Sequence, residues 1–343
     1  MGFVANYLRN LASVAAGRQP VRPLLFSYYI THRCNLNCRY CSDGDGRRFK
    51  EDPVAELTTA DAKRLLTILR RSADTLDVTG GEPMLREDLE EVLAHARAIG
   101  LRTVLNTKGA GLRERPELVR LSDTLVLSID TLDAAALAGV IGRSREAAER
   151  VLDGLRFAMA ERRRTATVVA VSAVATPENL ADVAAVMRFA LAGGLAFHVS
   201  PEIVGTRVNP ALRHSDGYRR LMAEVLAAKR TSRGVLGVPQ YLRGVADFRA
   251  FRCHPLLMPV IRPDGRMYYP CLESKRAEVN VLEAGDYGAA LREVRRRVGE
   301  VPACRDCCHL FCHMALSLFQ RHPLAAMGEW KHWRPSHAGQ PEA

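Results

Sequence analysis

Residues 31–42 read THRCNLNCRYCS and place three cysteines, Cys34, Cys38 and Cys41, in one short segment. Thiolates at this CxxxCxxC spacing can converge on one metal centre, and three is one fewer than a closed four-thiolate site needs. A four-iron cluster held by three cysteines keeps one iron open, and an open position at a metal site can bind a substrate or cofactor. Zinc is the alternative, with His32 as a further ligand, but the segment lacks a second nearby ligand pair. The spacing therefore favours an iron–sulfur cluster.

This segment resembles the signature of the radical S-adenosylmethionine (SAM) superfamily, including the aromatic Tyr40 before the third cysteine. The resemblance implies that Cys34, Cys38 and Cys41 are catalytic and hold a [4Fe–4S] cluster. It also implies that the reduced cluster passes one electron to bound SAM. Methionine and a 5′-deoxyadenosyl radical then form, and the radical removes a hydrogen atom from the substrate.

A second motif, GGEP, occupies residues Gly80, Gly81, Glu82 and Pro83 after a short predicted strand. Two glycines let the backbone approach a ligand closely, and a carboxylate can accept hydrogen bonds from an ammonium group. The motif is similar to the superfamily's GGEP element, which implies that these residues and Tyr40 contact SAM. Further candidate contacts to SAM or substrate lie at or near the carboxyl ends of later strands: Asn106, Ser128 and Asp130. Caps and turn residues are the alternative interpretation of these three.

Apolar strands and amphipathic helices alternate through much of the chain. This repeated unit predicts a parallel sheet with helices outside it, and six strands suit an open barrel better than a closed eightfold one. The resemblance implies the same fold, an α/β partial (βα)6 TIM-like barrel. We expect strands at residues 24–30, 76–79, 101–106, 124–130, 165–175 and 195–203, and helices at 58–69, 89–99, 116–121, 144–161, 177–192 and 214–230.

The C-terminal part contains a second group of cysteines. Residues 257–271 read as two strands joined at a Pro-Asp-Gly turn, which would bring Cys253 and Cys271 together. Cys304 and Cys307, a CxxC pair, complete four candidate metal ligands. The pattern resembles a shortened SPASM domain, the twitch domain, and this implies one auxiliary [4Fe–4S] cluster. Structural zinc fits the same spacing.

Two cysteines remain, Cys308 and Cys312, and no cysteine follows them. Their spacing departs from a full SPASM domain, so a second auxiliary cluster is not expected. They are interpreted as buried structural residues, or as hydrogen donors if they bind no metal. The resulting division of the chain is a helix in 1–20, the radical SAM barrel in 21–233, a twitch/SPASM-like iron–sulfur domain in 234–312, and a helix with a tail in 313–343.

The first helix places Phe3, Val4, Tyr7, Leu8 and Leu11 at helical spacing. Its apolar residues are expected to pack on the domain, and contact with a membrane surface is the less favoured alternative. No apolar run reaches the length of a membrane span, and the N-terminal residues do not read as a secretory signal. We therefore expect a cytoplasmic protein with reduced, metal-binding thiols.

The formal net charge is +11, but the basic residues are scattered and aromatic residues are few. This pattern indicates solvated helix faces rather than a nucleic-acid-binding surface. The excess charge weakly favours an anionic substrate, and the apolar chain ends would allow a lipid-like one. Glu202, His198 and Arg207 are candidate pocket residues.

The sequence thus predicts a radical SAM enzyme that removes a hydrogen atom from a small biosynthetic intermediate, with oxidation favoured as the outcome. The cluster would need a reductant such as flavodoxin or ferredoxin. A radical SAM epimerase or a peptide-modifying enzyme is the alternative within this class. A metal-stabilised nucleic-acid-binding module is the alternative outside it.

Overall fold

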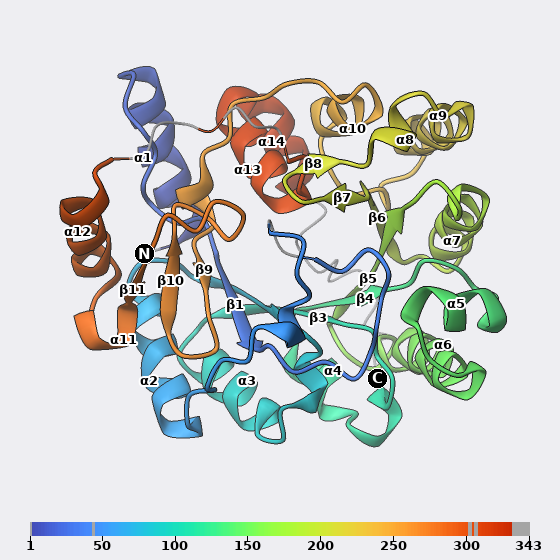
Figure 1. The fold of residues 1–343 in the computed structure, drawn as a ribbon, viewed down its shortest axis with the longest axis horizontal. Helices are drawn as coiled ribbons and strands as arrows, with labels where there is room; N and C mark the ends of the chain where they lie inside the picture. The colour runs from blue at the N-terminus through green and yellow to red at the C-terminus, as the bar shows by residue number, and fades with distance from the viewer. Residues whose placement is uncertain (1, 43–44, 301–303, 305–307, 331–343) are drawn as a thin grey trace, which may run out of the picture.

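The computed structural model describes residues 2–42, 45–300, 304 and 308–330. Strands β1 to β6 run parallel in chain order, and helices form an outer ring around them (Figure 1). The predicted α/β fold, a partial six-stranded barrel, is thereby confirmed. The strands of this part are β1 (Phe26–Thr31), β2 (Thr75–Gly80), β3 (Arg102–Thr107), β4 (Thr124–Ser128), β5 (Val168–Ala175) and β6 (Ala196–Pro201).

Two of the predicted helices begin with a side chain that caps the first turn. Thr58 accepts a hydrogen bond from the Asp61 amide at 3.1 Å, and Ser144 accepts one from the Ala147 amide at 3.3 Å. The first half of the chain contains α1 (Phe3–Ala15), α2 (Thr59–Arg70), α3 (Leu89–Ala98), α4 (Glu117–Leu121), α5 (Ala134–Ile141), α6 (Arg145–Glu161) and α7 (Leu180–Ala192). The second half contains α8 (Pro210–Arg213), α9 (Asp216–Thr231), α10 (Pro239–Ala246), α11 (Val281–Ala284), α12 (Tyr287–Val298), α13 (Phe311–Arg321) and α14 (Pro323–Trp330). Short 3₁₀ turns are η1 (Phe49–Glu51), η2 (Pro83–Leu85), η3 (Leu112–Glu114) and η4 (Pro255–Leu257).

Side chains alternate between the two faces of the sheet, as strand geometry requires. On β1 and β2 one set, including Tyr28 and Val78, is fully buried in the core. The opposite set is polar: Ser27 donates a hydrogen bond to Asp77 on β2 at 2.9 Å, and Ser172 on β5 lies 3.1 Å from the His198 ring on β6. We call this second face the inner face. It gives the barrel a polar interior.

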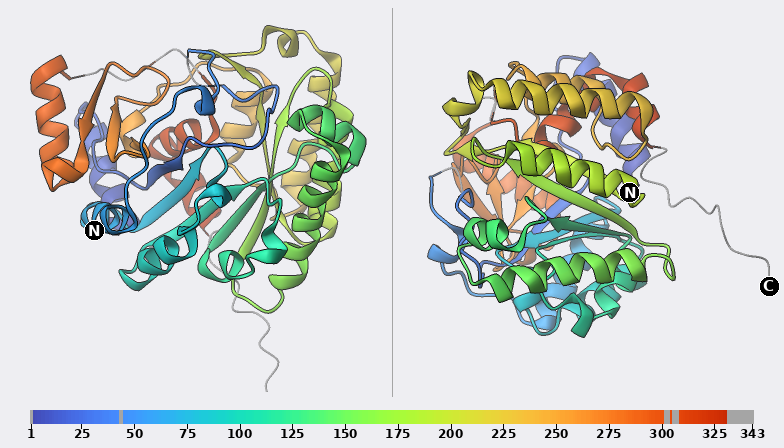
Figure 2. Two further views of the ribbon diagram at one scale, coloured as in Figure 1. Left: turned by 60° about the horizontal axis from the view of Figure 1, so that its bottom comes forward. Right: turned by 90° about the vertical axis from the view of Figure 1, so that its right-hand side faces the viewer.

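The predicted hairpin forms, but it joins the barrel sheet. Strands β9 (Val260–Ile261), β10 (Arg266–Tyr269) and β11 (Ala277–Asn280) extend the sheet beyond β1, and β9 runs parallel to β1. At the other edge, Val235 forms a bridge to Phe197 of β6. The sheet therefore continues across the boundary predicted at residues 233/234. The left view of Figure 2 shows β9 to β11, in orange, beside β1, in blue. A separate pair, β7 (Ile203–Val204) and β8 (Arg207–Val208), follows β6.

Helix α1 exists as predicted, and Phe3, Tyr7 and Leu11 pack on the domain, but the rest of its buried face differs from the prediction. Asn6 and Asn10 are buried, whereas Val4 and Leu8 are exposed to 45% and 58%. The Asn6 amide donates to the Pro23 and Ser72 carbonyls, both at 2.7 Å. The asparagines satisfy backbone carbonyls that would otherwise be buried without a donor, and this outweighs burial of the aliphatic residues. Among the described helices, none combines the length and apolar character needed to cross a bilayer.

Candidate active site

The cysteine segment follows β1 and lies inside the helical ring (Figure 1). It is anchored on α5, a helix that the sequence analysis did not predict. The Asn37 amide donates to the Ile141 carbonyl at 2.8 Å, and the Arg39 amide donates to the Val140 carbonyl at 3.2 Å. Gly142 ends α5 with φ +58°, and a Cβ there would lie 2.8 Å from the Asn37 side chain. The carboxyl end of α5 is thus a platform for the segment.

The three thiols are buried or half-buried and lie close enough for their charges to interact. Burial, and then the charges of Cys38 and Cys34, raise the pKa of Cys41 to about 11. In the described part of the chain, no three Cys, His, Asp or Glu side chains converge in an arrangement ready for a metal ion. The donor set nonetheless fits an iron–sulfur cluster chemically, because three thiols share one short segment and a bound metal would deprotonate them. His32 has a different role, because its Nδ1 forms a hydrogen bond with the Asp52 carbonyl oxygen at 2.9 Å.

The two glycines of GGEP let β2 end against the cysteine segment. A Cβ on Gly80 would lie 2.2 Å from the Thr31 carbonyl oxygen, and one on Gly81 would lie 2.2 Å from that of Arg33. The Glu82 amide also donates to the Arg33 carbonyl at 2.8 Å. Any side chain at these glycines would push the two motifs apart. Their contact with SAM remains a prediction, as does that of Pro83, which begins η2.

The Glu82 carboxylate is buried and accepts three hydrogen bonds. Its Oε1 receives the Thr107 hydroxyl at 2.5 Å and the Met84 amide at 3.1 Å, and its Oε2 receives the Lys108 amide at 3.0 Å. Burial raises its pKa, and these donors act in the opposite direction. Four acceptor positions on a carboxylate leave about one for a further donor. Glu82 and Leu36, together with residues of η2 and η3, line one cavity of about 220 Å³.

Tyr40 and Asp130, predicted separately, meet in the structure. The Tyr40 hydroxyl donates to Asp130 Oδ2 at 2.6 Å. Lys108 Nζ, which no motif predicted, donates to the same oxygen at 2.8 Å and to the Tyr40 hydroxyl at 3.0 Å. The only sequence signal for Lys108 was its position directly after β3, at the barrel edge where functional side chains gather.

Asn106 and Ser128 lie on the inner face rather than in this group. The Asn106 amide donates to Asp77, a carboxylate that the sequence analysis did not select. Ser128 stands opposite Ser172 in the ladder between β4 and β5. Burial raises the pKa of Asp77 to about 6, and its hydrogen-bond donors Ser27 and Asn106 lower it. Both donors are neutral, so they do not cancel the negative charge that this carboxylate carries when it is ionised.

The predicted pocket residues divide into two groups. His198 is buried on the inner face, with its ring 3.8 Å from that of Phe311 and its pKa lowered by burial to about 3. Its Nε2 lies 3.4 Å from the Tyr241 hydroxyl. Glu202 accepts a hydrogen bond from Asn209 at 2.5 Å, and Arg207 is exposed on β8. Only His198 lies beside the other polar residues of the interior.

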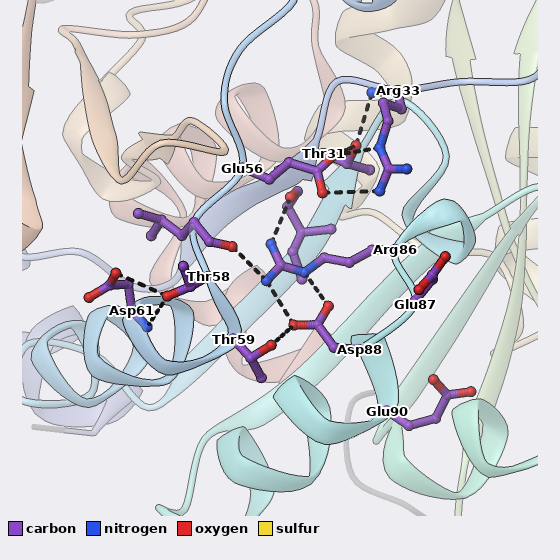
Figure 3. A network of polar contacts seen from close by, with 12 residues as sticks. Thr31, Arg33, Glu56, Thr58, Thr59, Asp61, Arg86, Glu87, Asp88 and Glu90 are labelled. Atoms are coloured by element: carbon purple, nitrogen blue, oxygen red, sulfur yellow. Dashed lines mark hydrogen bonds and ion pairs between the residues drawn. The ribbon is translucent and has the colours of Figure 1, made fainter.

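A second network supports the start of the cysteine segment (Figure 3). Thr31 and Arg33 both donate to Glu56, at 2.5 and 2.7 Å. The buried Arg86 donates to Asp88 at 2.6 Å and to the Leu57 carbonyl at 2.9 Å. Arg86 Nη1 also lies 3.4 Å from the carbonyl of Ile30 in β1. The segment after GGEP is therefore tied to the strand that leads into the cysteines.

The C-terminal cysteines form a distinct group. Cys253 and Cys304 are joined by a pair of backbone hydrogen bonds at 2.9 and 3.2 Å. Burial comes first among the causes that raise the pKa of Cys253, and the charges of Cys308, Cys271 and Cys304 follow. Cys308, omitted from the predicted ligands, thus lies near the other three. The fourth predicted ligand, Cys307, lies outside the described residues.

Cys312 belongs elsewhere. It packs against a small core cluster that contains Tyr7, Leu24 and Leu316, and its pKa is raised by burial and then by the charge of Asp77. The two cysteines left over in the sequence analysis therefore separate, with Cys308 beside the C-terminal thiols and Cys312 near the inner face.

Residues 28–190 match the Radical SAM superfamily. The chain is 37% identical over 177 residues to GTP 3′,8-cyclase of Mycobacterium marinum, an alignment that covers 50% of this chain and 48% of the relative. It is also 37% identical over 134 residues to PqqA peptide cyclase of Xanthomonas euvesicatoria, with 35% and 32% covered. The match thus spans about half or less of these curated relatives.

The fold is similar to that of SuiB from Streptococcus suis, solved with its precursor peptide SuiA. The TM-score is 0.60 at 17% identity, and the alignment covers 80% of this chain and 66% of SuiB. At this identity the similarity concerns the fold alone.

Proposed function

The chain contains a domain of the radical SAM superfamily, and we propose that the protein reductively cleaves SAM to remove a hydrogen atom from a small biosynthetic intermediate. The observation that carries the proposal is the convergence of the two motifs. The GGEP glycines pack directly on the cysteine segment, and Glu82 lines one cavity together with Asn35 and Leu36 of that segment. A cofactor bound there would touch both.

In this proposal Cys34, Cys38 and Cys41 hold a [4Fe–4S] cluster, which with SAM supplies one-electron cleavage and a hydrogen-abstracting radical. Glu82 accepts the ammonium group of SAM at its remaining acceptor position, and its three protein donors fix the carboxylate beforehand. Residues assigned to SAM or substrate contact are Tyr40, Gly80, Gly81, Pro83, Asn106, Ser128 and Asp130.

We assign a second [4Fe–4S] cluster to the C-terminal cysteines. Cys253, Cys271 and Cys304 would be ligands together with Cys307, and Cys308 lies close enough to be an alternative to it. A cluster with all four ligands filled suits electron transfer, so we favour an oxidoreductase outcome in which it accepts an electron from the substrate radical. Epimerisation is the second outcome, because the Cys312 thiol lies near the inner face.

The inner face is the proposed substrate chamber. It presents Asp77, Ser172 and His198, and burial keeps His198 uncharged at neutral pH. A carboxylate with only neutral donors favours a hydroxyl or amine group over a phosphate. This opposes the anionic substrate that net charge suggested, and it also opposes a triphosphate such as GTP. Peptides remain the alternative, since one relative is named a peptide cyclase. We place the reaction in the cytoplasm, where flavodoxin or ferredoxin could supply the electron.

Anaerobic reconstitution tests the proposal. The reduced protein should convert SAM to 5′-deoxyadenosine, and the C34A/C38A/C41A variant should form none. Cleavage at the normal rate by this variant would refute the assignment. The nucleic-acid alternative predicts no cleavage by either protein, together with RNA or DNA binding that weakens steeply with salt.

The net reaction is tested with the stimulating metabolite in heavy water. Oxidation yields a product two electrons more oxidised, whereas epimerisation places solvent deuterium on carbon. If only a peptide fraction stimulated 5′-deoxyadenosine formation, the proposal of a small-molecule substrate would be refuted. The proposed cleavage of SAM would still stand.

A further inference from the structure

Lys108 contacts both motifs, one through its backbone amide and the other through its side chain. Its backbone amide donates to Glu82 Oε2 at 3.0 Å. Its side chain reaches the cysteine segment, where Nζ donates to the Tyr40 hydroxyl at 3.0 Å. Tyr40 directly precedes Cys41, so a single residue after β3 contacts both the GGEP carboxylate and the neighbour of a cysteine ligand.

The connection is buried and charged. Lys108 is 7% exposed and Asp130 is fully buried, and their Nζ–Oδ2 distance is 2.8 Å. Burial alone would lower the pKa of Lys108, but the charge of Asp130 raises it well above its usual value, so the ammonium persists. The other oxygen of Asp130 accepts the Val174 amide of β5 at 3.0 Å. The pair is thus fixed to two strands beyond β3, which makes it a rigid support.

Tyr40 links the cysteine segment to this ion pair. Its hydroxyl donates to Asp130 at 2.6 Å while accepting from Lys108, so both of its hydrogen-bonding capacities are used. The Lys108 ammonium lies 5.6 Å from the centre of the Tyr40 ring. Without the hydroxyl the ion pair would persist, but the cysteine segment would lose its hydrogen bonds to Asp130 and Lys108.

We propose that Lys108 is a positioning residue that sets where the cysteine segment stands relative to Glu82, through the Tyr40–Asp130 contact. The inference rests on the proposed function, in which the first motif holds the cluster and the second holds SAM. Because the cluster and Glu82 would contact the same SAM molecule, a small change in their separation should weaken SAM binding. The cluster itself should still assemble, because its ligands remain within one segment.

The decisive variant is Tyr40→Phe, because it removes only the hydroxyl and leaves the Lys108–Asp130 pair intact. Tyr218→Phe is the matched control, since this buried tyrosine on α9 donates to the Val245 carbonyl at 3.0 Å, away from the site. Lys108→Met and Lys108→Arg form a second pair, in which only arginine keeps the charge. Two measurements use the reconstituted protein: its iron and sulfide content, and the EPR spectrum of the reduced cluster during SAM titration. A third measures trypsin cleavage after the exposed Arg39 in metal-free protein.

We expect Tyr40→Phe to bind iron as the wild type does but to need about five- to tenfold more SAM for the half-maximal EPR change, the effect of one lost hydrogen bond. Cleavage after Arg39 should accelerate in metal-free Tyr40→Phe and not in Tyr218→Phe. Lys108→Met should weaken SAM binding further, and Lys108→Arg should recover part of it. Wild-type SAM affinity in Tyr40→Phe, or an equal loss in Tyr218→Phe, would overturn the inference even if Lys108→Met fails to fold. A wild-type protein that assembles the cluster but does not respond to SAM would instead refute the proposed function.

Discussion

The two cysteine groups of this protein are built in opposite ways. Cys34, Cys38 and Cys41 come from one short segment, which α5, Lys108 and the end of β2 hold in place. The C-terminal thiols come from separate segments, and a backbone bridge between Cys253 and Cys304 draws two of those together. The cysteines of the first group are close in sequence, and other parts of the structure hold them in place. Those of the second group are far apart in sequence, and only folding brings them together. Disruption should therefore affect them differently.

The largest expected difference is in metal content. Cys253→Ala with Cys271→Ala should remove roughly half of the bound iron, since one of two four-iron clusters is lost. SAM cleavage should continue, because the first group keeps its own ligands and supports. Iron analysis and 5′-deoxyadenosine formation check both points. Cys312→Ala is the matched control for iron content, as this thiol lies away from the C-terminal group. Unchanged iron in the double variant would show that these thiols hold no cluster.

A smaller effect should follow from removing a polar support of the first group. Arg86→Met leaves Asp88 without its buried cation and the Leu57 carbonyl without its donor. We expect a loss of about 3 kcal/mol in the free energy of unfolding, measured as a lower Tm of the reconstituted protein. Arg86→Lys should lose less, because it keeps the charge but not the paired contacts.

Arg113→Met is the surface comparison for this prediction. Arg113 pairs with Asp153 at 2.8 Å, but both side chains are about half exposed to water. Water replaces such a contact readily, so the Tm should hardly change. An equal loss in the two variants would mean that the network in Figure 3 gives the cysteine segment no special support.

The smallest effect concerns the inner face and depends on pH. Because the pKa of Asp77 is raised to about 6, the folded protein holds this proton more tightly than the unfolded chain does. Stability therefore falls as the pH rises from about 4 to about 6, and the penalty is complete above that range. Asp77→Asn removes the penalty, which we put at about 1–2 kcal/mol because the residue is partly exposed.

Melting temperatures of the reconstituted protein at several pH values test this. Asp77→Asn should be more stable than the wild type at pH 8, and its advantage should disappear near pH 4. Asp153→Asn is the control and should show the opposite pH dependence, because Arg113 lowers the pKa of that carboxyl. A gain for Asp77→Asn that is the same at every pH would contradict an ionised carboxylate on the inner face.

The sequence alone identified the features that are local. CxxxCxxC and GGEP are short runs, and alternating apolar strands and helices predict a parallel sheet whose strand ends meet at one edge. The barrel and its strands follow that logic, whereas the contact between Tyr40 and Asp130 was not predicted. The spacing of apolar residues could not predict that Asn6 and Asn10 are buried where α1 packs on the domain. Burial of a side-chain amide depends on carbonyl acceptors that lie elsewhere in the chain.

Only the tertiary structure decided which residues join the two motifs. Lys108 and Asp77 carry no motif, and their importance arises from partners about 20 to 70 residues away. The hairpin of β9 and β10 reads as part of a separate domain, yet its strands complete the barrel sheet, since free hydrogen-bonding groups at the edge of β1 are satisfied by β9. Likewise Cys308 and Cys312 are four residues apart, but the turn into α13 sends one toward the C-terminal thiols and the other toward Asp77. Spacing determines what a short segment can bind, whereas burial and long-range hydrogen bonds determine where that segment stands.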